Sequence, residues 1–123
     1  MKRVLIIEDE YDEVKNAFEY VKDIFYSGEM ELTNVIKSQD IPFQNLERYD
    51  VIFLDITLAK RSKMDGYGIL KKIEQENISY NKLVIMTGNN KISYVLKERE
   101  ILGEYEILAK PLDFKELKLI IDG

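Results

Sequence analysis

Several residue types are missing from this chain of 123 residues, and each absence removes a class of chemistry. There is no cysteine, so neither a disulfide nor a thiolate metal site can form. There is no histidine, which removes the commonest general base and the commonest transition-metal ligand. No apolar run approaches the roughly 18 residues that span a bilayer, and the apolar stretch after Met1-Lys2-Arg3 is too short for a signal peptide. We therefore expect a cytoplasmic protein without a membrane partner.

Positive charge is also in deficit, with 18 Lys and Arg residues against 23 Asp and Glu residues and a net charge of −5. This balance, together with the lack of a basic cluster, argues against direct nucleic-acid binding. The hydrophobic content of 46% and the charged content of 33% are ordinary for a globular protein. The length is enough for one stable core, so we expect a single domain over residues 1–123.

What the chain does contain is a series of short apolar runs that end in polar residues. Such runs are typical of strands buried on both faces of a parallel sheet. They alternate with segments whose apolar residues recur at helical spacing. We expect a doubly wound α/β fold with right-handed crossovers. The predicted strands are 3–8, 30–37, 50–55, 82–87 and 105–109, and the predicted helices are 11–26, 66–77, 90–102 and 112–121, with a shorter helix near Pro42.

The polar residues that follow these runs are the candidate functional residues. In open α/β sheets the ligand site lies outside the carboxyl ends of the strands. Parallel strands end at one edge, so we expect these side chains to gather there. They are Glu8 and Asp9 after the first strand, Asp55 after the third, Thr87 and Gly88 after the fourth, and Lys110 with Pro111 after the fifth.

The chemistry of this set favours phosphoryl transfer assisted by a metal ion. Carboxylates suit Mg²⁺, and a carboxylate beside a bound metal can act as a nucleophile towards phosphorus. Asp55 follows four apolar residues, where an unpartnered carboxylate is costly to bury. The hydroxyl of Thr87 and the ammonium of Lys110 would supply the donors and the charge that the transfer needs. A cis bond before Pro111 would fix the loop that aims Lys110.

Each residue also has a simpler interpretation when it is taken alone. Glu8 and Asp9 could serve only the dipole of the following helix. Thr87 could be an ordinary β-branched residue at a strand end, and Lys110 a solvated loop lysine. The combination at one sheet edge favours the functional interpretation.

The ordered motifs resemble the receiver domain of two-component response regulators, and the resemblance covers the whole chain. The motifs that carry it are Glu8-Asp9, Asp55, Asp65-Gly66, Thr87-Gly88 and Lys110-Pro111. The resemblance implies a flavodoxin-like (βα)5 fold with a sheet of order 2-1-3-4-5.

The resemblance also implies a role for each matching residue. Asp55 would accept a phosphoryl group from a sensor histidine kinase or a phosphotransfer protein. Glu8, Asp9, Asp55 and the backbone carbonyl of Thr57 would hold Mg²⁺ or Mn²⁺, and Thr87, Gly88 and Lys110 would bind the phosphoryl oxygens. Such a chain catalyses its own phosphorylation and dephosphorylation, and its main role is that of a switch that controls an effector protein or an output domain.

The loop after Asp55 departs from the family pattern. Ala59 stands where the family usually has proline, and the loop is longer than usual and contains Lys60, Arg61 and Lys63. Exposed charges are the norm, so these cations are expected to form a solvated loop. The alternative hypothesis is that they steer an acidic partner or shield the aspartyl phosphate from water.

The position that usually holds a switching aromatic ring also departs from the pattern, because it is Ile107. A β-branched side chain is stiff and too small to exchange an exposed pose for a buried one of comparable area. Tyr105 lies two residues earlier on the same face of the strand and could act in the ring's place. We therefore expect a weak or rewired coupling from Thr87 to the surface formed by the helix at 90–102, the last strand and the last helix.

Three other functions match parts of this pattern. A haloacid-dehalogenase-type phosphotransferase would need an acid at position 57, which is Thr57. A flavodoxin would need a phosphate loop after the first strand, where Glu8 and Asp9 would repel phosphate. The remaining alternative is a receiver-like interaction module that takes no phosphate.

Overall fold

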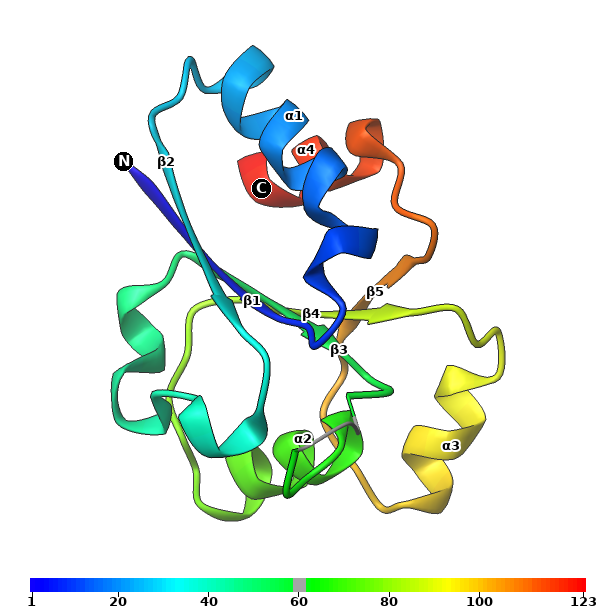
Figure 1. The fold of residues 1–123 in the computed structure, drawn as a ribbon. Helices are drawn as coiled ribbons and strands as arrows, with labels where there is room; N and C mark the ends of the chain where they lie inside the picture. The colour runs from blue at the N-terminus through cyan, green and yellow to red at the C-terminus, as the bar shows by residue number, and fades with distance from the viewer. Residues whose placement is uncertain (59–61) are drawn as a thin grey trace.

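Five parallel strands form the centre of the molecule (Figure 1). The computed structural model describes residues 1–58 and 62–123. The sheet order is β2-β1-β3-β4-β5, which confirms the expected flavodoxin-like fold. Because the order reverses between β1 and β3, the carboxyl ends of these two strands form the crevice where such sheets bind ligands. The strands are β1 (Lys2–Ile7), β2 (Met30–Val35), β3 (Val51–Asp55), β4 (Leu83–Thr87) and β5 (Glu106–Ala109).

Helices cover both faces of the sheet (Figure 1). The helices α1 (Lys15–Phe25) and α4 (Phe114–Asp122) lie on one face, and α2 (Gly66–Gln75) and α3 (Ile92–Glu98) lie on the other. None of the helices in the described part of the chain is long and apolar enough to cross a membrane.

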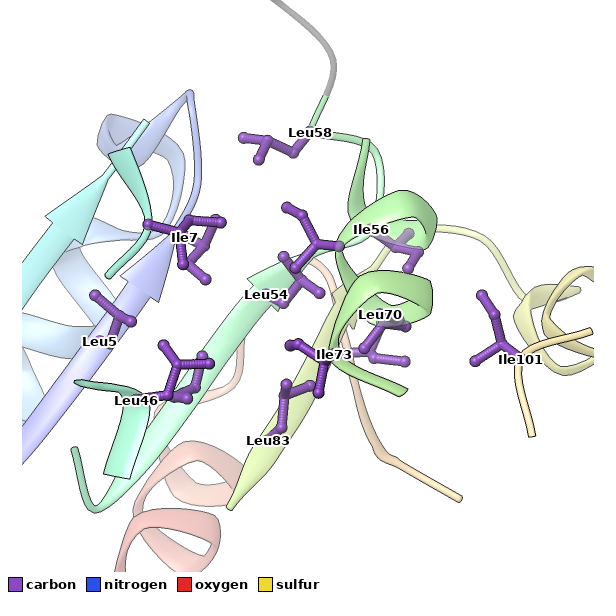
Figure 2. Packing of buried hydrophobic residues seen from close by; sticks show 14 of the residues in the cluster. Leu5, Ile7, Leu46, Leu54, Ile56, Leu58, Leu70, Ile73, Leu83 and Ile101 are labelled. Atoms are coloured by element: carbon purple, nitrogen blue, oxygen red, sulfur yellow. The ribbon is translucent and has the colours of Figure 1, made fainter. Parts of the chain in front are cut away.

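Alternate residues of β3 show how each face acquires its core. Ile52 and Leu54 pack under α2 and α3, whereas Val51 and Phe53 pack under α1 and α4. Figure 2 shows the first of these clusters from close by. Both faces of the central strand are therefore buried, as the continuous apolar run predicts.

The segment between β2 and β3 differs from the sequence-based expectation. Instead of an α-helix near Pro42 it forms two 3₁₀ segments, Ser38–Asp40 and Phe43–Arg48, and Asn45 interrupts the second with φ −132°. Leu46 is the only residue of Phe43–Arg48 that is buried. Most helical stability in proteins comes from packing an apolar face, so a segment with one buried side chain has little reason to form an α-helix.

The expected helix over 90–102 is also too long. It ends at Glu98, and Glu100 has a left-handed backbone with φ 59°. The chain then turns inward, so that Ile101 is buried and its N–H donates to the carbonyl of Leu96 at 2.9 Å. Residues 101–102, which continue the apolar helical pattern, are therefore part of the connection to β5.

Candidate functional site

The register of the paired strands determines which candidate residues lie side by side at the edge of the sheet. Ile7 of β1 is level with Leu54 of β3, so Glu8 and Asp55 follow side by side. Thr87 of β4 is level with Ala109 of β5, so Lys110 lies one step beyond Thr87. The sheet therefore delivers the expected side chains to one edge.

Three carboxylates meet there. Glu8, Asp9 and Asp55 each offer an oxygen, and these oxygens lie within 4.8 Å of one another. Glu8 is 1% exposed and Asp55 is 3% exposed, whereas Asp9 is half-buried. Three acids on neighbouring strands form a hard, oxygen-rich donor set, and that chemistry fits a divalent cation such as Mg²⁺.

Lys110 supplies the positive charge of the cluster. Its ammonium donates a hydrogen bond to Glu8 Oε1 and lies 3.4 Å from Asp55 Oδ1. Its backbone N–H donates to the carbonyl of Thr87 at 2.9 Å, which extends the β4–β5 pairing past the strand ends. The peptide bond between Lys110 and Pro111 is cis.

Thr57 makes a contact that the sequence did not predict. Its hydroxyl donates to Asp55 Oδ1 at 3.0 Å, and its backbone N–H donates to the same oxygen at 3.2 Å. A hydroxyl two residues after a strand-ending acid is a recognisable side-chain turn, so this contact could have been inferred.

Asn34 is a second residue that the sequence interpretation missed. Its side-chain amide donates to the carbonyls of Ile6 at 3.0 Å and Glu8 at 3.1 Å. Asparagine is depleted in strands, so its presence near the end of β2 was a usable sign of a special role. Here it braces the end of β1 next to the acids.

Thr87 is buried at the same edge and Gly88 is exposed beside it. Thr87 Oγ1 accepts the backbone N–H of Asn89 at 2.9 Å. Because a hydroxyl can accept and donate together, this leaves the hydroxyl hydrogen of Thr87 available to a ligand.

Asp65 and Gly66 lie where α2 begins, close to the carboxyl end of β3. Asp65 caps the helix by accepting the N–H of Gly68 at 2.8 Å. A Cβ at Gly66 would lie 2.5 Å from the Cα of Ile56 and 2.7 Å from the carbonyl oxygen of Asp55. Glycine is therefore required at position 66 for α2 to start directly against the backbone of Asp55.

The cations of the loop after Asp55 lie largely outside the described residues. Ala59, Lys60 and Arg61 lie outside them, and Lys63 is exposed. The backbone N–H of Lys63 donates to the side chain of Gln39 at 3.1 Å. The steering and shielding hypotheses remain predictions.

Burial shifts the proton affinity of the acid cluster. The pKa of Glu8 is raised to about 8, because burial and the hydrogen bond with Asp55 together outweigh the opposing effect of Lys110. For Lys110, burial alone would lower the pKa, but the hydrogen bond to Glu8 and the charge of Asp55 raise it. Without a metal ion, the cluster therefore holds a proton that a divalent cation would displace.

We expect the free energy of unfolding to fall as the pH rises through roughly 6 to 8 when divalent cations are chelated. The folded-state pKa of Glu8 is raised from 4.5, so its contribution is fully present below 4.5 and is lost as the pH approaches about 8. The chain has no histidine, so no other side chain with an ordinary pKa titrates in this window. Urea denaturation across the window measures the slope.

Glu8→Gln is the matched variant for this measurement, because it keeps the size of the side chain and removes the titrating proton. Its stability should change little over the same pH range. A variant with the same slope as the wild-type protein would contradict the assignment of the proton to Glu8.

Comparison with known proteins agrees with this geometry. The family model of the response regulator receiver domain matches residues 4–122. The chain belongs to this family. A search of curated protein sequences gives no significant match to the receiver.

Solved structures share the fold of this receiver at low sequence identity. The receiver domain of Francisella response regulator 1452 is 23% identical with a TM-score of 0.70, and the match covers 99% of this chain and 94% of that one. The signal receiver domain of a DNA-binding response regulator (merR) from Colwellia psychrerythraea is 22% identical with a TM-score of 0.75, covering 99% and 96%. NtrX from Brucella abortus is 21% identical with a TM-score of 0.71, and the receiver spans only 26% of that chain, although 98% of the receiver is matched.

Proposed function

We propose that this receiver accepts a phosphoryl group on Asp55 in a reaction that depends on Mg²⁺ or Mn²⁺. The donor would be the phosphohistidine of a sensor kinase or phosphotransfer protein. The observation that carries the proposal is the meeting of three carboxylates with one ammonium at the crevice between β1 and β3. The phosphorylated state would control a partner or an output domain, and the whole process would take place in the cytoplasm.

The transfer exchanges one bond for another. An oxygen of the Asp55 carboxylate forms a bond to phosphorus, while the bond from phosphorus to the donor's imidazole nitrogen breaks and its electron pair stays on that nitrogen. Hydrogen bonds from Thr57 hold Asp55 Oδ1, which fixes the orientation of the carboxylate before the transfer. The single positive charge of Lys110 offsets part of the charge of about −1.5 to −2 that the phosphoryl group brings. The hydroxyl of Thr87 and the N–H of Gly88 would donate to its oxygens.

The residues that would hold the cation are Glu8, Asp9, Asp55 and the carbonyl of Thr57. A divalent ion bound there would neutralise charge on the phosphoryl oxygens. Glu8 and Asp55 are buried on adjacent strands, so their oxygens are fixed before any ligand binds. A fixed donor set stabilises the transfer because it needs little rearrangement during the reaction.

The proposal is tested by the mass of the intact protein after incubation with acetyl phosphate and Mg²⁺. We expect one phosphate adduct in the wild-type protein and none when the cation is chelated. Asp55→Asn should abolish the adduct. Asp50→Asn is the matched control, because Asp50 precedes the same strand at its opposite end and accepts the N–H of Arg3 at 2.8 Å.

Two outcomes would contradict the proposal. An adduct that persists in Asp55→Asn would place the phosphate on another residue. A wild-type protein that takes no phosphate from acetyl phosphate or from a phosphorylated kinase would favour an interaction module that is not phosphorylated.

A further inference from the structure

One face of α2 is tied by polar contacts to the segment that leads from α3 to β5. Tyr67, Lys71 and Glu74 lie four and three residues apart, so they line one side of the helix. All three contact residues 99–105. We call these contacts, together with the ion pair between Asp65 and Arg99, the α2 seam. Figure 1 shows the segment passing α2 on its way to β5.

The end of the seam near the acid cluster is built around Arg99. Its guanidinium lies 3.4 Å from Asp65 Oδ2 and 4.6 Å from the centre of the Tyr67 ring. Its carbonyl accepts the ammonium of Lys71 at 2.9 Å. These contacts attach the C-terminal end of α3 to the N-terminal half of α2.

The far end of the seam is built around Glu74, whose carboxylate accepts three hydrogen bonds. The backbone N–H groups of Leu102 and Gly103 donate to it at 2.9 Å each, and the hydroxyl of Tyr105 donates at 2.6 Å. Bonds to a charged acceptor are stronger than those between neutral groups. For Glu74, burial alone would raise the pKa, but these three bonds outweigh it and lower the pKa.

Gly103 packs closely against the side chains of Glu74 and Tyr105. A Cβ at this position would lie 2.8 Å from Glu74 Oε2 and 2.8 Å from the hydroxyl oxygen of Tyr105. A side chain at residue 103 would therefore have to displace the ends of the Glu74 and Tyr105 side chains, which form these hydrogen bonds. The contact is therefore specific in both its hydrogen bonds and its shape.

The seam connects at its other end with the acid cluster. Gly66 begins α2 in direct contact with the backbone of Asp55 and Ile56, and its N–H donates to the carbonyl of Ile56 at 3.2 Å. A change at Asp55 that moves this backbone must move the start of α2, because the packing leaves no gap. A helix of 10 residues passes such a displacement to Glu74 at its other end.

We propose that Glu74 is the positioning residue that couples the state of Asp55 to Tyr105 and the 102–103 backbone, so that α2 carries the response that an aromatic ring at position 107 carries elsewhere in the family. Ile107 is 38% exposed and presents no ring to move inward. Tyr105 is half-buried against the α2 side of the core and is held by Glu74. This inference rests on the proposed phosphorylation of Asp55.

The test follows backbone amide shifts when Mg²⁺ and beryllofluoride, a phosphoryl mimic, are added. In the wild-type protein we expect shifts at residues 55–57 and 87–88, and a second group at 102–105, with weak shifts in α4. Glu74→Gln keeps the size of the side chain but turns one acceptor into a donor that faces other donors. It should keep the first group of shifts and lose most of the second.

Two further variants make the result specific. Tyr105→Phe keeps the ring and removes only the hydroxyl, so it should reduce the second group of shifts even if Glu74→Gln proves poorly folded. Glu76→Gln is the matched control, because Glu76 directly follows the last residue of the same helix and pairs with Lys72 at 2.8 Å, away from the seam. It should leave both groups of shifts as in the wild-type protein.

The outcomes separate this inference from the proposed function. Shifts at 55–57 without shifts at 102–105 in the wild-type protein, or shifts at 102–105 that survive in both Glu74→Gln and Tyr105→Phe, would overturn the α2 route and leave phosphorylation standing. No shift at 55–57 in the wild-type protein would overturn the proposed function, and the inference with it. Coupling is reciprocal, so a working seam also requires that Glu74→Gln change the affinity for beryllofluoride, by about fivefold or more.

Discussion

Replacing Lys110 with methionine should slow the phosphorylation of Asp55 by acetyl phosphate by roughly 100-fold. The ammonium of Lys110 is the cation that the structure places against both Glu8 and Asp55. Methionine keeps an unbranched apolar stem of similar length, so packing at this half-buried position is preserved while the charge is lost. The rate of adduct formation, measured by intact mass over time, tests the expectation.

The fold should survive this substitution. Glu8 already has a raised pKa because it is buried, so loss of its cationic partner leaves a protonated carboxyl and not a bare buried charge. Lys118→Met is the matched control, since it removes one positive charge from an ion pair with Asp122 on α4, away from the site. Phosphorylation of Lys110→Met at the wild-type rate would show that Lys110 has no part in the transfer.

Gly66→Ala should lower the free energy of unfolding by about 3 kcal/mol. The added Cβ would stand 2.5 Å from the Cα of Ile56 and 2.7 Å from two carbonyl oxygens. These are backbone atoms between β3 and α2, so they cannot rotate away as a side-chain tip would. The clash should exceed any gain in helix propensity, which is at most about 1 kcal/mol for glycine to alanine. Urea denaturation measures the difference.

Gly68→Ala, in the same helix, is the control for the propensity effect. Its Cβ would lie 3.2 Å from the Cβ of Met64, a side-chain contact that a shift of a few tenths of an ångström would relieve. We expect its stability to remain within about 1 kcal/mol of the wild-type value. Equal stabilities for the two variants would mean that α2 is not in close contact with the backbone at Asp55.

The parts of the fold that the sequence predicts well are those in which one local pattern decides the outcome. The continuous apolar run of β3 ends at Asp55 as expected, and the order of the sheet follows from the family resemblance. The same runs place Glu8, Asp55 and Lys110 at one edge, because parallel strands can end nowhere else. Their functional roles stay predictions until phosphorylation is measured.

The parts that the sequence does not predict depend on contacts between distant residues. The 3₁₀ segments between β2 and β3 form because few of their side chains find a core to pack against, and the local pattern cannot show this. Glu74 and Tyr105 are 31 positions apart, and two of the three groups that Glu74 binds are backbone amides, which leave no trace in the sequence. The left-handed turn at Glu100 has no glycine to mark it.

The position of β5 at the edge of the sheet has a consequence for protein synthesis. Glu8 and its cation, Lys110, are 102 positions apart, and the strand that brings Lys110 is the last one to be made. Until that strand pairs with β4, the ammonium of Lys110 is not in place beside Glu8 and Asp55. The cluster of charged groups is therefore complete only when β5 has paired, so under the proposed function a partly made receiver would lack the ammonium that the transfer needs. Under that proposal, phosphorylation would be restricted to receivers whose sheet is fully assembled.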